Sequence, residues 1–235
     1  MLILGLNKTT LLDFPGHVAA ALFIGGCNFR CPYCHNRDIV LKNESLIPLT
    51  PEEIFAFLKK RRSVLTGVCI TGGEPTLYPD LPELIRQIKE LGYLIKLDSN
   101  GTNPQMLYNL IHTGLIDYCA MDIKNAPEKY EITIGFHNNQ PKFDLAAIDE
   151  SVQILMQQNL IPYEFRTTIV KELHDESDML GISRWIAGAD AYFLQSYTDS
   201  DGVLCDGYHA HSEETLQKYA LLCRQSIPNT VLRGV

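Results

Sequence analysis

The chain has 235 residues, a formal net charge of −8 and 46% hydrophobic residues, which is enough apolar material for one well-buried core. The acidic balance disfavours a nucleic acid partner, because affinity for nucleic acid depends largely on neutralising phosphates. The opening MLILGL is shorter than a secretory core of roughly 7 to 15 residues or a membrane span of about 20. We therefore expect a single cytoplasmic domain over residues 1–235, with neither nucleic acid nor membrane as its partner.

Apolar runs alternate with amphipathic segments along the chain, and turn residues mark the boundaries between them. The run from Thr50 to Glu53, for example, combines an N-cap, a proline at the first helical position and a capping-box glutamate. The pattern predicts strands at residues 18–24, 67–71, 94–98, 117–122, 163–169 and 191–195. It predicts helices at residues 50–62, 80–92, 103–114, 144–159, 177–188 and 211–226.

These elements form six strand–helix units. Six parallel strands with their crossovers on one side would make a partial (β/α)6 barrel, an α/β fold related to the eight-stranded barrel. The loops at the carboxyl ends of the strands would then form the site, and the long connection 125–142 is a candidate functional loop. A doubly wound open sheet remains an alternative, because barrel closure is not written in any single segment.

The cysteines give the sharpest signal. Seven cysteines in a cytosolic chain are not expected to form disulfides, and three of them, Cys27, Cys31 and Cys34, fall within eight residues. Closely spaced thiolates favour an iron–sulfur cluster or zinc. A [4Fe–4S] cluster whose ligands all come from the protein takes four cysteines. Three cysteines would leave one iron open to a small molecule. The competing hypothesis is a structural zinc ion completed by His35, although adjacent ligands are unusual for zinc.

Polar residues follow several of the predicted strands. Gly72 and Gly73 allow close backbone approach to a ligand, and Glu74 is an acceptor for an ammonium group, although the same residues also suit a plain tight turn. Asp98, Ser99 and Asn100 follow the third predicted strand, where the alternative is an Asx-type turn. Asp122 and Lys124 follow the fourth, where the alternative is a surface ion pair.

Arg166 and Gln195 lie inside apolar strands, where a charged or polar side chain needs a partner or a ligand. An ion pair between Arg166 and Glu164 is not expected. His209 and His211 are interpreted as part of a polar loop. The remaining cysteines, Cys69, Cys119, Cys205 and Cys223, predict no second cluster.

The cysteine loop resembles the C-x3-C-x-aromatic-C signature of the radical S-adenosylmethionine (SAM) superfamily, with Tyr33 at the aromatic position. The resemblance implies that the three thiolates hold a [4Fe–4S] cluster whose open iron takes the amino and carboxylate groups of SAM. An electron from the cluster would then break the sulfonium C–S bond and release methionine and a 5′-deoxyadenosyl radical. Air sensitivity would follow from the exposed cluster.

The resemblance also implies which residues contact SAM. The GGEP segment would line the amino group of SAM. Asp98, Ser99 and Asp122 would surround the carboxylate of SAM, with a monovalent cation as an optional addition. Lys124 would face the same carboxylate. The superfamily more often has Thr where Ser99 stands. The full set of expected SAM contacts is Tyr33, His35, Gly72, Gly73, Glu74, Asp98, Ser99, Asn100, Asp122, Lys124, Arg166 and Gln195.

Within the superfamily the chain resembles the activating proteins of anaerobic ribonucleoside-triphosphate reductase, through KTTLLDFPG, GCNFRCPYCHN, ITGGEPTL, LDSNGTNP, AMDIK and EFRTT. That resemblance implies a glycyl radical enzyme as partner and an electron donor of the flavodoxin or ferredoxin type. The CHN after Tyr33 also resembles pyruvate formate-lyase activating enzymes. A radical enzyme acting on a small molecule and a zinc-binding adaptor are the remaining hypotheses.

Overall fold

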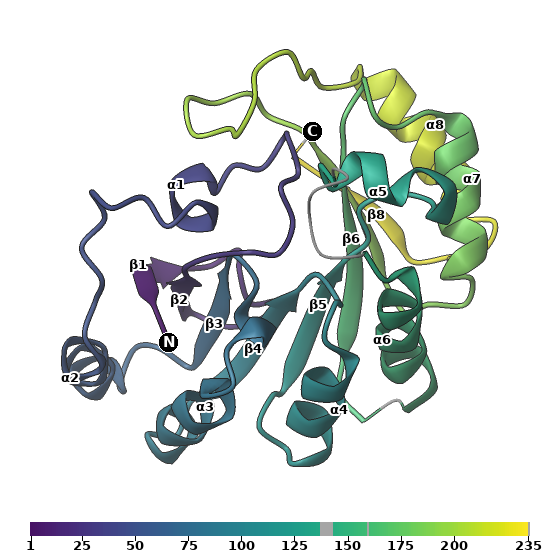
Figure 1. Cartoon of the computed structure of the whole chain (residues 1–235). Helices are drawn as coiled ribbons and strands as arrows, with labels where there is room; N and C mark the ends of the chain where they lie inside the picture. The colour runs from purple at the N-terminus through teal and green to yellow at the C-terminus, as the bar shows by residue number, and fades with distance from the viewer. Residues whose placement is uncertain (137–142, 159, 235) are drawn as a thin grey trace. The chain divides into compact units, whose positions relative to one another are not determined.

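The computed structural model describes residues 1–136, 143–158 and 160–234, and it divides the chain into two compact units. The first unit comprises Met1–Asn28, Asp38–Ala120 and Leu160–Pro162. The second comprises Phe29–Arg37, Met121–Asn159 and Tyr163–Val235. Figure 1 shows strands and helices alternating along both units. The expectation of one domain over the whole chain stays a prediction.

The first unit contains a sheet in which the strands follow their order in the chain, from β1 to β4. Strand β1 (Ile3–Thr10) pairs antiparallel with β2 (Ala19–Ile24), and β2, β3 (Gly67–Gly72) and β4 (Leu94–Ser99) pair in parallel. The helices of this part are α1 (Arg37–Val40), α2 (Pro51–Arg61), η1 (Pro75–Leu77), α3 (Leu81–Glu90) and α4 (Pro104–His112). Strand β5 (Tyr118–Asp122) begins in the first unit and ends in the second.

The second unit contains β6 (Tyr163–Ile169), β7 (Tyr192–Ser196) and β8 (Thr230–Arg233), which pair in parallel in that order. Its helices are η2 (Pro127–Lys129), α5 (Tyr130–Thr133), α6 (Leu145–Gln158), α7 (Glu176–Trp185) and α8 (Glu213–Cys223). The sheet of each unit is buried: Ala19 to Leu22 are 0% exposed in β2, as are Phe165 and Leu194 in β6 and β7. Strands without an exposed face suit a parallel sheet covered by helices.

Capping chemistry explains several helix boundaries. Thr50 and Glu53 form the predicted capping box at the start of α2, and Asn103 accepts from the Met106 amide at the start of α4. Asp80 stands at the predicted N-cap of α3 but makes no capping hydrogen bond. Its carboxylate instead pairs with the amino group of Met1 at 2.6 Å.

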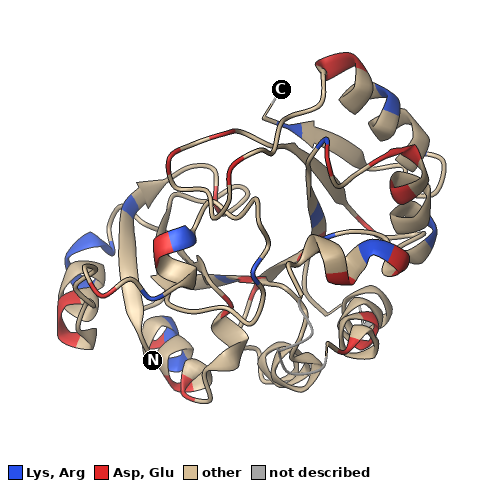
Figure 2. Ribbon diagram, turned by 45° about the horizontal axis from the view of Figure 1, so that its top comes forward, with Lys and Arg blue, Asp and Glu red and all other residues tan. Residues whose placement is uncertain are grey.

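Helix α2 also has acidic residues in its first turn and basic residues in its last, which complements the helix dipole and is visible in the charge colouring of Figure 2.

The six predicted strands all form, and the α/β class with parallel strands is confirmed. Two strands were not predicted. β1 is an edge strand whose second half, Asn7 to Thr10, is polar, and β8 has only four residues, so neither shows a strong periodic signal.

The first half of the candidate functional loop 125–142 contains the short helices η2 and α5, and a functional role of the loop stays a prediction. Residues 137–142 and the predicted helix end at residue 159 lie outside the described residues. In the described part of the chain no helix is long and apolar enough to cross a bilayer.

Candidate active site

Glu74 is a fully buried carboxylate two residues beyond the end of β3, in the first unit. Its Oε1 accepts from the amide and hydroxyl of Thr76 and, at 2.9 Å, from Ser99 Oγ, while Oε2 accepts from the Asn100 amide at 2.6 Å. Burial raises the pKa of Glu74, and these hydrogen bonds oppose the rise. Glu74 therefore joins the turn after β3 to the segment after β4, which brings three of the predicted site residues together.

The two glycines before Glu74 pack against the start of the cysteine loop. The Gly73 amide donates to the Ile24 carbonyl at 2.8 Å, and the Glu74 amide donates to the Gly26 carbonyl at 2.9 Å. A Cβ on Gly73 would lie 1.9 Å from the Gly26 oxygen, and Gly72 has a φ of +110°. The sequence predicts close approach to a ligand, and the structure shows close approach to the backbone of the chain itself.

Cys27 lies beside a cluster of amide side chains in the same unit. The Asn100 Nδ2 is 3.8 Å from the Cys27 sulfur and donates to Asn28 Oδ1 at 2.9 Å. The amide and hydroxyl of Thr102 donate to Asn100 Oδ1 at 3.0 and 2.7 Å. The Asn100 carboxamide, an expected SAM contact, is thus engaged by protein groups, and it offers an N–H donor to a cysteine sulfur.

Asp98 pairs with a buried lysine that the sequence analysis did not single out. Lys96, 1% exposed on β4, makes an ion pair with the Asp98 carboxylate, and its ammonium lies 4.0 Å from the Cys69 sulfur. The signal was present, because a charged residue inside an apolar strand is the same feature that singled out Arg166.

The second unit gathers a carboxylate and two cations. Asp122, at the end of β5, accepts from Arg166 Nε and from Lys124 Nζ, each at 2.9 Å. The side chains are 30% exposed for Asp122 and 18% for each cation. Burial raises the pKa of Asp122, but the positive charges outweigh burial and hold this pKa well below its usual range. The three groups together carry one net positive charge, which favours an anion nearby.

Cys31, Tyr33 and Cys34 belong to the same unit, and the charge of Lys124 reaches all three. Burial lowers the pKa of Lys124, while Asp122, Tyr33 and Cys31 outweigh burial and raise it well above its usual range. Burial raises the pKa of the Cys34 thiol, and Lys124 is among the charges that lower it. The Tyr33 hydroxyl is buried and has no hydrogen-bond partner among the described residues. Six predicted site residues of this unit are therefore neighbours: Cys31, Tyr33, Cys34, Asp122, Lys124 and Arg166.

Backbone contacts hold the second half of the cysteine loop. The Cys34 amide donates to the Cys31 carbonyl at 3.0 Å, forming a turn. The Cys34 carbonyl accepts from the Leu204 amide at 3.0 Å, and the Pro32 carbonyl accepts from the Cys205 amide at 2.8 Å. The segment that contains Cys205 thus supports the loop through its backbone.

Two expected SAM contacts lie exposed in the second unit. The His35 ring stacks on Tyr197 with centroids 5.4 Å apart, and its Nε2 is 2.5 Å from the Thr198 carbonyl. Gln195 is exposed on β7. The unassigned histidines find protein partners: His209 pairs with Glu172 at 2.7 Å, and His211 contacts the His174 carbonyl at 2.9 Å.

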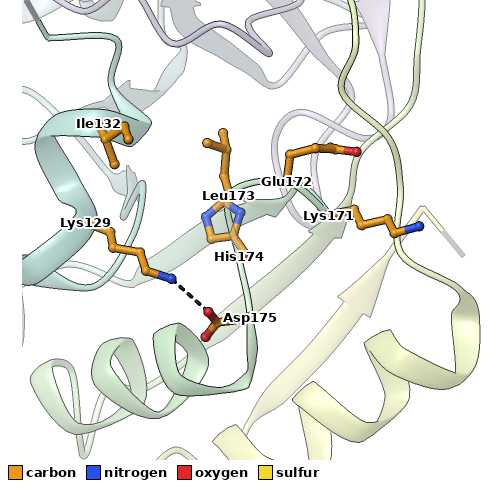
Figure 3. A pocket seen from close by; sticks show the side chains of 7 residues that line it. All are labelled: Lys129, Ile132, Lys171, Glu172, Leu173, His174 and Asp175. Atoms are coloured by element: carbon orange, nitrogen blue, oxygen red, sulfur yellow. Dashed lines mark hydrogen bonds and ion pairs between the residues drawn. The ribbon is translucent and has the colours of Figure 1, made fainter.

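A pocket of about 220 Å³ in the second unit is lined by residues 129, 132 and 171–175 (Figure 3). None of the residues predicted for the site lines this pocket. The Lys129 ammonium is bonded to Asp175 and Asp178 at 2.8 and 2.9 Å. Glu172 is bonded to His209, so three charged groups of the lining, Lys129, Asp175 and Glu172, already have protein partners.

The donor set fits an iron–sulfur cluster. The thiols of Cys27, Cys31 and Cys34 are not in disulfides, Cys27 has an amide donor beside its sulfur, and the Lys124 charge opposes the burial that raises the pKa of the Cys34 thiol. Among the described residues, neither unit by itself contains three His, Cys, Asp or Glu side chains gathered around one metal ion.

The sequence profile of the Radical SAM superfamily matches residues 22–179, a span that includes the cysteine loop, GGEP and the 122–124 segment. The chain belongs to the radical SAM superfamily. Members of this superfamily use a [4Fe–4S] cluster and SAM, so these are the cofactors of the chain, and the chain is an enzyme that uses SAM radical chemistry.

Individual relatives agree with the superfamily assignment. A Methanocaldococcus jannaschii protein, provisionally named a glycyl-radical enzyme activating enzyme, is 31% identical over 240 residues, covering 100% of this chain and 96% of that protein. A Thermococcus kodakarensis protein named as a probable GTP 3′,8-cyclase is 29% identical over 153 residues, covering 63% of this chain and 46% of that protein.

A solved structure with bound SAM shows the same fold. The structure of Streptococcus suis SuiB bound to SAM matches with a TM-score of 0.65 and 14% identity, covering 91% of this chain and 52% of that chain. The predicted radical-SAM type of α/β fold, with its mostly parallel sheet, is therefore confirmed.

Proposed function

We propose that the chain activates a glycyl radical enzyme by abstracting hydrogen from a backbone glycine of that partner. The observation that carries this proposal is the match to the Methanocaldococcus jannaschii protein, which runs through nearly the whole length of both chains. The anaerobic ribonucleoside-triphosphate reductase is the partner we favour, on the motifs quoted above. An electron donor of the flavodoxin or ferredoxin type belongs to the same proposal.

We place the cluster on Cys27, Cys31 and Cys34. When bound, the reduced cluster supplies the electron that breaks the sulfonium C–S bond of SAM and yields the 5′-deoxyadenosyl radical. Asn100 would donate to the Cys27 sulfur, and hydrogen bonds to sulfur are one of the means by which a protein sets the potential of a cluster. Ligation requires Cys34 to be deprotonated, and the charge of Lys124 would oppose the burial that raises the pKa of this thiol.

We place the SAM carboxylate against Lys124 and Arg166, because the group that they form with Asp122 has a net positive charge. The amino group would lie at the GGEP turn, where Glu74 is a buried acceptor held in one orientation by Thr76, Ser99 and Asn100. The optional monovalent cation stays a prediction, since Asp98 and Asp122 each already bond to cationic side chains.

Electron paramagnetic resonance tests the proposal. The anaerobically reconstituted chain is mixed with SAM, dithionite and purified anaerobic ribonucleoside-triphosphate reductase, and in parallel with pyruvate formate-lyase. A glycine-centred doublet on the reductase supports the favoured partner, and a doublet on the lyase alone reassigns the partner. Formation of 5′-deoxyadenosine with no doublet on either enzyme would contradict glycyl radical activation while leaving SAM cleavage intact.

A second candidate function is radical chemistry on a small molecule. The match to the protein named as a probable GTP 3′,8-cyclase supports it. That relative extends well beyond the matched region, since the match covers 46% of it. If this function holds, GTP should stimulate 5′-deoxyadenosine formation in the absence of any protein partner.

A further inference from the structure

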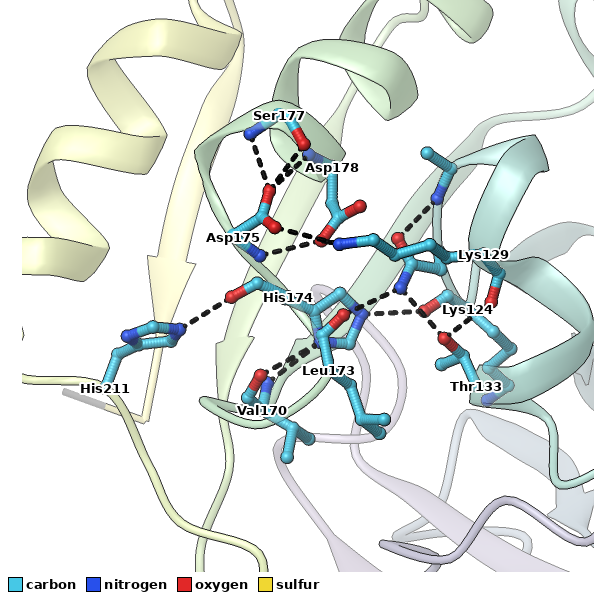
Figure 4. A network of polar contacts seen from close by, with 12 residues as sticks. Lys124, Lys129, Thr133, Val170, Leu173, His174, Asp175, Ser177, Asp178 and His211 are labelled. Carbon is cyan, nitrogen blue, oxygen red and sulfur yellow. Dashed lines mark hydrogen bonds and ion pairs between the residues drawn. The ribbon is translucent and has the colours of Figure 1, made fainter.

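The main chain of Lys124 is held by two side chains of the second unit. Lys124 lies just beyond the end of β5. Its amide donates to the Tyr130 hydroxyl at 3.3 Å. Its carbonyl accepts from His174 Nε2 at 2.8 Å, as Figure 4 shows. Both backbone groups of this residue therefore depend on side chains of the second unit for their position.

His174 is suited to hold such a carbonyl because its ring is buried between fixed backbone groups. The ring is 1% exposed, and Nδ1 lies 3.0 Å from the Val170 amide nitrogen, from which it accepts, and 3.3 Å from the Val170 carbonyl. A carbonyl can only accept, so Nε2 must carry the proton. Burial lowers the pKa of His174, which favours this neutral form.

The loop that carries His174 has other anchors. Asn125 Nδ2 donates to the Leu173 carbonyl at 3.0 Å, and Lys129 pairs with Asp175 and Asp178. His211 contacts the His174 carbonyl at 2.9 Å, from the segment before α8. These contacts should hold the loop in place if the His174 ring were replaced. The hydrogen bond from the ring to Lys124 is therefore not needed to keep the loop folded.

We propose that His174 is a positioning residue for Lys124, and that its Nε2–H fixes the Lys124 peptide so that the ammonium stays between Asp122 and the carboxylate of SAM. The inference rests on the proposed function at one point, the assignment of Lys124 to the SAM carboxylate. Partner identity does not enter it.

Two substitutions separate this role from a structural one. In His174→Gln the side-chain amide can reach the Lys124 carbonyl, while the contact with Val170 is lost. In His174→Asn the side-chain oxygen can accept from the Val170 amide, while the reach to Lys124 is lost. Each variant keeps one of the two hydrogen bonds, so their midpoints of thermal unfolding should fall by similar amounts. His209→Asn is the matched control, because His209 is 69% exposed and bonds to Glu172.

The measurement is the dissociation constant for SAM of the cluster-loaded full chain, together with the rate of 5′-deoxyadenosine formation at saturating SAM. We expect His174→Gln and His209→Asn to bind SAM within about twofold of the unaltered chain, and His174→Asn to bind about tenfold more weakly. The rates at saturation should agree, since the interaction that is lost is made equally in the ground state and in the transition state.

Long-range nitrogen–proton correlations in histidine-labelled, oxidised, cluster-loaded protein should also show the proton of His174 on Nε2. Equal weakening in the Gln and Asn variants would assign His174 a purely structural role, and equal wild-type binding in both, or a proton on Nδ1, would also overturn the inference. Failure of the unaltered chain to bind SAM would overturn the proposed function as well.

Discussion

The guanidinium Nε of Arg166 donates to Asp122 Oδ1 at 2.9 Å, so β6 supplies a cation to the carboxylate that ends β5. Lys124 occupies the other carboxylate oxygen. Arg166 is therefore fixed by Asp122, and Glu164, two residues away on the same strand, pairs instead with Arg233 at 2.9 Å. The sequence-based expectation that Arg166 and Glu164 do not pair stays a prediction.

Replacing Asp122 with Asn should destabilise the protein at neutral pH, because Lys124 and Arg166 would lose the carboxylate between them. We expect the free energy of unfolding to fall by about 1–3 kcal/mol at pH 7. This figure is smaller than for a fully buried group, because solvent partly screens the charges. The folded pKa of Asp122 lies below its usual value of 3.8, so this stabilisation is present above that pH and is lost as the pH falls below it. Urea unfolding at a series of pH values measures the difference.

The control for this prediction is Lys218→Met, which removes an exposed pair with Glu176 and should leave the free energy of unfolding nearly unchanged. An Asp122→Asn variant as stable as the unaltered chain at pH 7 would show that the three charged groups do not stabilise one another.

Glu74 should give a pH dependence of the opposite sign. Burial raises its folded pKa above the usual 4.5, so ionisation of Glu74 destabilises the folded state. The unaltered chain should therefore lose stability relative to Glu74→Gln as the pH rises from 4.5 through the folded pKa. At low pH the Glu74→Gln variant should still be less stable than the unaltered chain, by about 1–3 kcal/mol. The reason is that the glutamine NH2 group would face a backbone N–H, so that two donors would meet. The exposed capping-box residue Glu53 is the comparison, since its pKa is lowered. A stability difference that widens with pH would contradict this account of Glu74.

Gly73→Ala tests the contact between the GGEP turn and the cysteine loop. Its Cβ would overlap the Gly26 carbonyl, so backbone must move, and we expect a loss of about 3 kcal/mol or more in unfolding free energy. Gly188→Ala is the control: Gly188 has a φ of +85° and no atom within 4 Å of its Cβ position, so the cost should be about 1–2 kcal/mol of backbone strain. Equal losses in the two variants would show that the overlap at Gly26 is relieved easily.

The sequence predicted the strands that carry the motifs because their signals are local. Buried parallel strands are continuous apolar runs, and the capping box at Thr50 is readable within four residues. The candidate site could be predicted only as a set of residues. Which of them bond to one another depends on tertiary packing, as the engagement of Asn100 by Asn28 and Thr102 shows.

A residue that acts by positioning another residue is not marked by a sequence motif. His174 stands in a segment, ELHDES, that suggests only a helix start, and its role depends on a carbonyl 50 residues earlier in the chain. Lys96 was detectable, since a lysine within LIKLD has to find a partner in the core.

The most direct test of the central claim, that Cys27, Cys31 and Cys34 hold the cluster on which SAM is cleaved, is iron and 5′-deoxyadenosine analysis after anaerobic reconstitution. We expect about four irons per chain and dithionite-dependent 5′-deoxyadenosine in the unaltered protein and in Cys223→Ala, whose thiol is buried in α8, and neither in Cys31→Ala. A bound zinc ion without 5′-deoxyadenosine formation, or equal loss in both variants, would contradict the account.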